Sequence, residues 1–217
     1  YSVIIDSALG LMGAEPKDRE DFLAHIDWLH HYLTTKPAPT YPFAIDQAKA
    51  GQGKQVFAAH CAGCHASERT GTVVPLAEIG TDRERMDTWN AKAAAEANQV
   101  VDDMGIERKG LVEEPLTGYV AQYLDGIWLR APYLHNGSVP TLYDLLLPPA
   151  QRPERFHRGY DVYDPVKVGY LTSGSEAVHA GTLHDTSARA NSAQGHDFAS
   201  QLSDDQRWSL VEYLKTL

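Results

Sequence analysis

The chain has 217 residues, of which 43% are hydrophobic and 22% charged, a composition typical of a globular protein with its own core. Its formal net charge of -10 at pH 7 argues against binding of nucleic acid or anionic lipid, which needs clustered Lys and Arg. No apolar run approaches the roughly 18 residues of a membrane span. We therefore expect no membrane span, no nucleic-acid partner, and a cationic or neutral partner protein.

The N-terminal part of the sequence predicts a helical arm and a linker. No charged segment followed by an apolar stretch begins at Tyr1, so we expect a processed chain or a fragment. From about Pro16 to Thr35, apolar residues recur at helical spacing and predict an amphipathic helix with a buried face. Prolines between residues 36 and 42 cannot continue this helix. We expect the arm and linker over residues 1–43 and one domain over residues 44–217.

Three further helices are predicted in the first two thirds of that domain. One should begin with Asp46 as its N-cap and run to about His60. An Ala-rich helix is predicted between Thr81 and Val101. After a loop that starts at Gly126, a short helix should follow Pro140.

The last third of the sequence predicts an irregular region and a well-defined final helix. Residues 160–162 and 166–170 flank a turn dipeptide and could pair as a small hairpin, whereas residues 172–195 predict a long loop. Residues 203–206 form a capping-box pattern before an apolar helical face that ends at Leu217. We expect a mainly α fold, in which the helix ending at His60 crosses the final helix and a long loop-rich insertion includes a short β-hairpin.

The motif that carries chemistry is Cys61-Ala62-Gly63-Cys64-His65. This is the c-type haem attachment pattern, in which two thiols add to haem vinyl groups and the adjacent imidazole binds iron. Two intervening residues allow one helical turn, so both sulfurs reach neighbouring vinyl groups while His65 projects toward the metal. The sequence has two cysteines in total, which predicts one covalent haem c and no disulfide framework.

Two other readings of a Cys pair are less consistent with this sequence. A structural zinc site needs about four ligands, and neither a second Cys pair nor a His-x3-5-His cluster is present. A thioredoxin-like redox pair lies between a strand and a helix, whereas this motif follows helical sequence.

Beyond this motif, the chain resembles a known family of haem proteins. Residues 124–142, with Ala131-Pro132-Tyr133 and His135-Asn136-Gly137-Ser138, resemble a long loop of the bacterial di-haem cytochrome c peroxidase superfamily. The closest resemblance is to the C-terminal haem module of its rubber-oxygenase-like branch, and it covers roughly residues 37–217. It continues through Arg152-Pro153, Phe156, Gly159-Tyr160, Asp164-Pro165, Gly195-His196 and residues 212–217. The resemblance implies a cytochrome c-like haem domain over residues 44–217.

The sequence departs from that family in two respects. The family's enzymes carry two Cys-x-x-Cys-His motifs on two haem domains, and this chain has one. Peroxidase members also place a methionine after the loop histidine, where this chain has Leu147-Pro148-Pro149. The rubber-oxygenase-like branch supplies instead a histidine in a Gly-His pair, which His196 matches.

The sixth iron ligand stays open among several candidates. Met86 and Met104 are candidates because methionine is a common cytochrome c ligand, and His135 or an open position is also compatible with the sequence. The resemblance favours His196. We therefore name His65 and His196 as the predicted metal ligands.

Other residues are candidates for contact with the haem. Its anionic propionates favour Arg, Tyr or Trp donors, so Arg130 and Tyr133 come first and Arg152 and Arg155 second. Trp128 should pack against the haem or the core, and His135 should brace its loop by hydrogen bonds. The predicted haem-binding residues are thus Cys61, Cys64, His65, Trp128, Arg130, Tyr133, His135 and Arg152.

Three functions are compatible with these features. With two protein ligands on iron the chain would transfer single electrons, and we predict no catalytic residue in it. The second hypothesis is part of a di-haem peroxidase or oxygenase whose catalytic haem lies on another domain or chain. The third is a binding or sensing haem protein with an open iron position. The expected partner is a redox protein or a second haem domain, and the resemblance implies a periplasmic or extracellular location in a Gram-negative bacterium.

Overall fold

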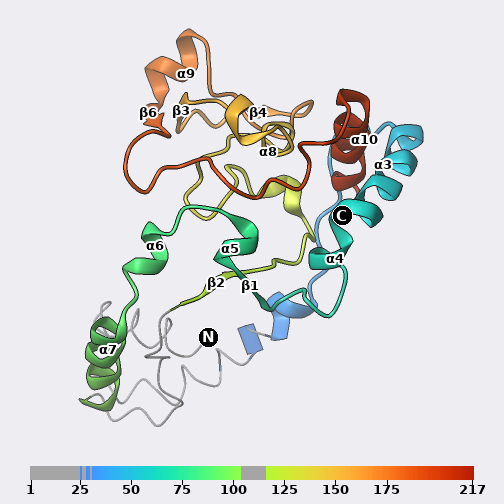
Figure 1. Ribbon diagram of the computed structural model, residues 1–217. Helices are drawn as coiled ribbons and strands as arrows, with labels where there is room; N and C mark the ends of the chain where they lie inside the picture. The colour runs from blue at the N-terminus through green and yellow to red at the C-terminus, as the bar shows by residue number, and fades with distance from the viewer. Residues whose placement is uncertain (1–24, 26–27, 30, 104–115) are drawn as a thin grey trace. The chain divides into compact units, whose positions relative to one another are not determined.

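The computed structural model describes residues 25, 28–29, 31–103 and 116–217 (Figure 1). The chain divides into two compact units. One comprises Tyr1–Pro37 and Asp87–Leu116, and the other comprises Ala38–Met86 and Thr117–Leu217. The sequence-based boundary between residues 43 and 44 stays a prediction. The second unit contains the Cys-x-x-Cys-His motif and is described in most detail.

In the first unit, the described residues are mainly helical. Residues 25, 28–29 and 31–35 are helical, and the remainder of the helix predicted from Pro16 to Thr35 lies outside the described residues. Leu29 and Leu33 are exposed, so the expectation that this helical face is buried was wrong for these two residues.

The single helix predicted from Thr81 to Val101 is two helices, α6 (Glu84–Asp87) and α7 (Ala91–Asp103). The interruption has a local cause. The Asn90 side chain accepts a hydrogen bond from the Ala93 N–H, as an N-cap does, and so begins a new helix.

The core of the second unit is a pair of crossing helices, α3 (Gln47–His60) and α10 (Asp204–Leu214), which lie side by side in Figure 1. Both helices and both caps were predicted and are confirmed. Asp46 accepts from two backbone N–H groups at the start of α3, and α10 begins with a complete capping box. At the crossing, a Cβ on Gly53 would overlap the Ser209 carbonyl, so the two backbones approach each other closely.

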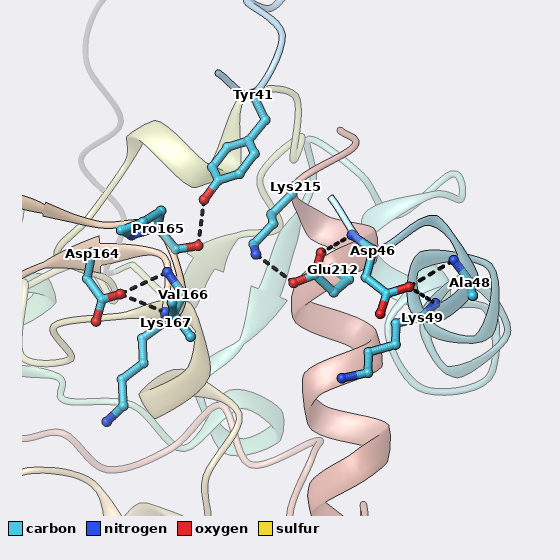
Figure 2. A network of polar contacts seen from close by, with 10 residues as sticks. All are labelled: Tyr41, Asp46, Ala48, Lys49, Asp164, Pro165, Val166, Lys167, Glu212 and Lys215. Atoms are coloured by element: carbon cyan, nitrogen blue, oxygen red, sulfur yellow. Dashed lines mark hydrogen bonds and ion pairs between the residues drawn. The ribbon is translucent and has the colours of Figure 1, made fainter. Parts of the chain in front are cut away.

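A polar network joins the start of α3 and the end of α10 to Tyr41 and to the turn at Pro165 (Figure 2). Glu212 on α10 accepts a hydrogen bond from the Asp46 N–H at 2.8 Å and pairs with the buried Lys215 ammonium at 2.6 Å. Lys215 lies 5.4 Å from the centre of the Tyr41 ring, and the Tyr41 hydroxyl donates to the Pro165 carbonyl. The start of α3, the end of α10 and the turn at Pro165 are therefore tied together.

The described strands form three antiparallel pairs. β1 (Val73–Pro75) pairs with β2 (Gly118–Val120), β3 (Arg155–Arg158) with β6 (Thr182–Asp185), and β4 (Tyr163–Asp164) with β5 (Gly169–Tyr170). The predicted hairpin exists, but its strands are shifted because Asp164 itself accepts from two N–H groups of the turn. The loop predicted over residues 172–195 was wrong, since it contains α9 (Ser175–Ala180) and β6.

Short helices complete the second unit. They are α4 (Ala62–His65), α5 (Leu76–Ile79), η2 (Ile127–Leu129), α8 (Leu142–Leu145) and η3 (Pro149–Gln151). α8 follows Pro140 as predicted, and the Thr141 side chain caps it. Leu142 and Leu146 pack in one core with residues of α3, η2 and α10, including Phe57, Trp128, Leu210 and Val211. The described residues are mainly helical, as predicted, and none of their helices is long and apolar enough to cross a membrane.

The close helix crossing predicts opposite effects of alanine at two glycines of α3. Gly53→Ala should destabilise the folded protein by about 1–3 kcal/mol, because the new methyl group meets backbone that cannot move aside cheaply. Gly51→Ala is the matched control: it has no atom near its Cβ position, so it should gain about 0.5–1 kcal/mol of helix propensity. Urea unfolding followed by circular dichroism measures both. Equal effects of the two substitutions would contradict the crossing.

Candidate haem-binding site

The Cys-x-x-Cys-His motif lies where α3 gives way to α4. The Cys61 N–H donates to the Phe57 carbonyl at 2.8 Å, and the Cys64 and His65 N–H groups both donate to the Cys61 carbonyl. The two thiols are therefore separated by the turn at Cys61 that joins α3 to α4. Burial, with a smaller effect of Cys64, raises the pKa of the Cys61 thiol to about 11. A redox-active Cys-x-x-Cys pair needs a lowered thiol pKa, so this environment argues against the thioredoxin-like reading.

The His65 ring is oriented by a backbone carbonyl. Its Nδ1 lies 2.8 Å from the Gln122 carbonyl oxygen, just after β2. A carbonyl oxygen only accepts hydrogen bonds, so Nδ1 carries the proton and Nε2 keeps its lone pair. Metal-bound histidines commonly have this arrangement, because the second hydrogen bond fixes both the tautomer and the ring orientation.

His196 faces His65 across a gap of suitable size for one metal ion. The two ring centres are 6.2 Å apart, with an interplanar angle of 51°. Two imidazoles on opposite sides of one metal, with bonds of about 2.0–2.1 Å, have ring centres roughly 6 Å apart. His196 is half-buried, and two main effects lower the pKa of its ring to about 4. The larger effect is desolvation by the surrounding protein, and the smaller is repulsion from His65. The ring is therefore neutral at pH 7, the form that binds a metal.

The backbone at His196 adopts an uncommon conformation. His196 has φ of 49° and Gly195 has φ of 79°, so both lie in the left-handed region. The His196 N–H donates to the Ile79 carbonyl at 2.7 Å, and a Cβ on Gly195 would overlap the backbone at Gly80. Residues at the end of α5 thus support the ligand segment directly. This contact could not be predicted from the sequence, because it joins backbone atoms that are distant in the chain.

Arg152 is buried behind the ligand segment. Its guanidinium group has five N–H bonds, and all five donate to backbone carbonyls. The acceptors are the carbonyls of Leu145, Leu147, Ala193, Gly195 and His196. Burial lowers the pKa of Arg152 to about 10, which still leaves the side chain cationic at pH 7. The direct haem contact inferred from the sequence stays a prediction, but these bonds leave no N–H of Arg152 for a propionate.

The polar side-chain atoms of Arg130 and Tyr133 also donate hydrogen bonds to backbone carbonyls. Arg130 donates to the carbonyls of Tyr123 and Asp125 at 2.7 and 2.6 Å and so closes its own loop. The buried Tyr133 hydroxyl donates to backbone carbonyls at 3.2 and 3.4 Å, and burial raises the pKa of Tyr133 strongly. Both side chains therefore position the loop over residues 124–142, and their haem contacts stay predictions.

Asn136 provides the loop bracing that we expected from His135. Its amide donates to the carbonyls of Ala190 and Ser192, and the Ser138 hydroxyl also donates to Ser192. The family-like loop is thus pinned to the segment that leads to His196.

Three buried polar atoms near these elements have no hydrogen-bond partner in the described part of the chain: Trp128 Nε1, His135 Nε2 and Thr81 Oγ1. Trp128 packs edge-on against Tyr41, and His135 stacks on the Tyr119 ring at 4.2 Å. Burial lowers the pKa of His135 and favours its neutral ring. A buried polar group without a partner lowers the stability of the folded protein. Trp128, His135 and Thr81 are therefore suited to a bound group that supplies hydrogen-bond acceptors, as the carboxylates of haem do. Thr81 was not predicted, because a single threonine carries no sequence signal.

The remaining candidates have other surroundings. Met86 is buried in α6, and Met104 lies outside the described residues. Arg155 is bound to Asp185 across the β3–β6 pair. Within the described ranges, no group of three or more His, Cys, Asp or Glu side chains could hold a metal ion.

Comparison with known proteins agrees with this geometry. A cytochrome c family model matches residues 50–124, and a model described as RoxA-like, cytochrome c-like matches residues 118–157. Together they cover the Cys-x-x-Cys-His motif and the loop that contains His135. Residues 50–124 therefore match a cytochrome c domain, which is of the mainly α class, and residues 118–157 are similar to the RoxA-like type.

Two curated proteins of Sinorhizobium fredii are similar to the chain. The uncharacterized protein y4iM is 36% identical over 233 residues, which cover 86% of this chain and 52% of the relative. The uncharacterized protein y4iJ is 42% identical over 123 residues, which cover 52% of this chain and 20% of the relative. The chain thus spans about half of the first relative and a fifth of the second.

The unpaired Trp128 N–H predicts a role in compensating haem charge. Trp128→Phe keeps most of the ring and removes the N–H. Without this donor a haem carboxylate keeps more negative charge, which stabilises ferric iron. The midpoint potential of the holoprotein should therefore fall by on the order of tens of mV. Trp208→Phe is the control, because Trp208 stacks on Tyr143 and its N–H is not among the buried atoms without a hydrogen-bond partner. Redox titration of both variants measures the effect. An unchanged potential with increased stability would show instead that the N–H has no acceptor.

Proposed function

Because residues 50–124 match a cytochrome c domain and residues 118–157 are similar to the RoxA-like type, we propose that the chain carries one haem c and transfers single electrons. Cys61 and Cys64 hold the haem covalently, and His65 and His196 are its two axial ligands. The observation that carries this proposal is the facing pair of imidazoles, 6.2 Å apart between ring centres.

The residues divide the work of binding and positioning. A bound haem c supplies a one-electron couple between ferric and ferrous iron. Cys61 and Cys64 fix its edge to the end of α3, and the Gln122 carbonyl holds His65 with Nε2 free to bind. With His196 as a second iron ligand, peroxide or oxygen would have to displace one of the two histidines to reach the iron. This arrangement favours electron transfer through the haem edge over catalysis at iron.

The partner and location are part of the proposal. The net charge of -10 favours a cationic or neutral redox partner, or a second haem domain that presents such a surface. Attachment machinery for Cys-x-x-Cys-His motifs works outside the cytoplasm, so we place the protein in the periplasm or outside the cell. Recovery of the haem-loaded chain from the cytosolic fraction would contradict this location.

A second candidate function is electron supply to a catalytic haem elsewhere in a larger protein. The match of residues 118–157 to the RoxA-like model favours it, and so does the fact that the chain spans about half of y4iM. In this case the domain has the same ligands, and the activity belongs to another domain or chain.

Substitution of His196 tests the ligand pair. The native ferric haem should be six-coordinate and low-spin, and its ferrous form should bind carbon monoxide poorly. His196→Ala should open one position, shift the iron toward high spin and admit carbon monoxide, as seen by visible and electron paramagnetic resonance spectra. Met86→Leu and Met104→Leu are controls and should leave the spectra unchanged. A methionine-to-iron charge-transfer band that disappears in either Met variant would show that this methionine binds the iron and that His196 does not.

Substitution of the cysteines tests covalent attachment. Haem should stay with the native polypeptide through acid-acetone extraction and denaturing gels, because thioether bonds survive both treatments. Cys61→Ser and Cys64→Ser should each retain one bond, and the double variant should lose the colour on extraction. Complete extraction of haem from the native chain would exclude the proposed cofactor.

A further inference from the structure

We propose that Arg152 is a positioning residue that holds His196 in place as the second iron ligand, an inference that rests on the function proposed above. Arg152 acts through the backbone carbonyls of Ala193, Gly195 and His196.

The hydrogen bonds of Arg152 divide into two groups. Nη1 donates to the carbonyls of Ala193 and Gly195 at 2.6 and 2.8 Å, and Nη2 donates to that of His196 at 3.3 Å. The other two bonds reach the carbonyls of Leu145 and Leu147, at the end of α8. One rigid guanidinium group thus joins the ligand segment to a helix of the core.

The ligand segment needs such support because its own backbone is irregular. Gly195 and His196 are both left-handed, and for a residue with a Cβ this conformation is unfavourable unless its surroundings enforce it. The segment rests on Ile79 and Gly80. Arg152 binds the same segment independently, so the segment is tied both to α5 and to the end of α8.

No other side chain could replace this contact. Arginine presents five N–H donors in a fixed plane, whereas lysine has three and glutamine two. Among the described ion pairs Arg152 has no carboxylate partner; the Asp197 carboxylate acts on its charge from farther away, and carbonyl oxygens accept from its N–H groups. An arginine buried for general stability would be equally well served by a carboxylate. Five carbonyls, three of them between Ala193 and His196, indicate that the side chain organises this backbone.

The test uses two variants and one matched control in the ferric holoprotein. Arg152→Lys keeps the positive charge but has too few donors, and Arg152→Gln loses charge and most donors. Arg207→Gln is the control, because Arg207 also donates to a carbonyl at the end of α8, that of Leu146, but its other bond goes to Ser200. The measurements are the high-spin fraction by electron paramagnetic resonance and the affinity for cyanide, which must displace one axial ligand.

If Arg152 positions His196, both Arg152 variants should gain a high-spin fraction, the Gln variant more than the Lys variant. Cyanide affinity should rise by about tenfold or more in Arg152→Gln, because apparent affinity follows the fraction of protein with an open iron position. Arg207→Gln should match the native protein in both measurements. Circular dichroism should show that all variants keep the native helix content.

Four results would overturn the inference. Arg152 variants with native spin state and cyanide affinity would show that His196 needs no such support. The same change in Arg207→Gln would show a general loosening, and loss of the whole fold in both Arg152 variants would assign the residue to overall stability. A native protein without bis-histidine spectra, or with spectra unchanged in His196→Ala, would instead remove the proposed ligand pair and this inference with it.

Discussion

The structure depends on one constraint, the separation of 6.2 Å between the rings of His65 and His196. Two imidazoles from distant parts of the sequence can share one metal only if both backbones are fixed in place. His65 is fixed locally, because it follows Cys61 within one helical turn at the end of α3. His196 lies in irregular chain and depends on long-range contacts. The α3–α10 crossing at Gly53 matters for the same reason, because it anchors the helix that carries His65.

Backbone carbonyls perform most of the positioning on both sides of this pair. The Gln122 carbonyl sets the tautomer of His65, and the Ile79 carbonyl binds the His196 N–H. Carbonyls of residues 193–196 bind Arg152. Such contacts depend on where the chain runs and not on which side chain an acceptor residue carries. A substitution at Gln122 would therefore change little, whereas one at Arg152 removes the donor for all of its contacts.

The same distinction explains how much could be predicted from the sequence. The helices that begin after Asp46 and Ser203 were predicted because their caps and apolar spacing are local, and the Cys61–His65 motif is local too. Two predictions were wrong. One helix was expected where the cap at Asn90 begins a second helix, and a loop was expected where β6 pairs with β3. Arg152 was predicted to contact the haem, and this contact stays a prediction; its five carbonyl acceptors could not be foreseen without the fold. Composition alone made a propionate its expected partner.

The buried polar atoms can be sorted by whether the protein itself satisfies them. Arg152 is satisfied in full, so it can fix a backbone without any bound group. Trp128 and His135 are not, and each leaves a buried nitrogen without a partner among the described residues. An indole N–H can only donate, so whatever completes the Trp128 environment must be an acceptor. A haem carboxylate meets that requirement and a metal ion alone does not. The unpaired Trp128 and His135 nitrogens are therefore compatible with a bound group that carries carboxylates, as haem does.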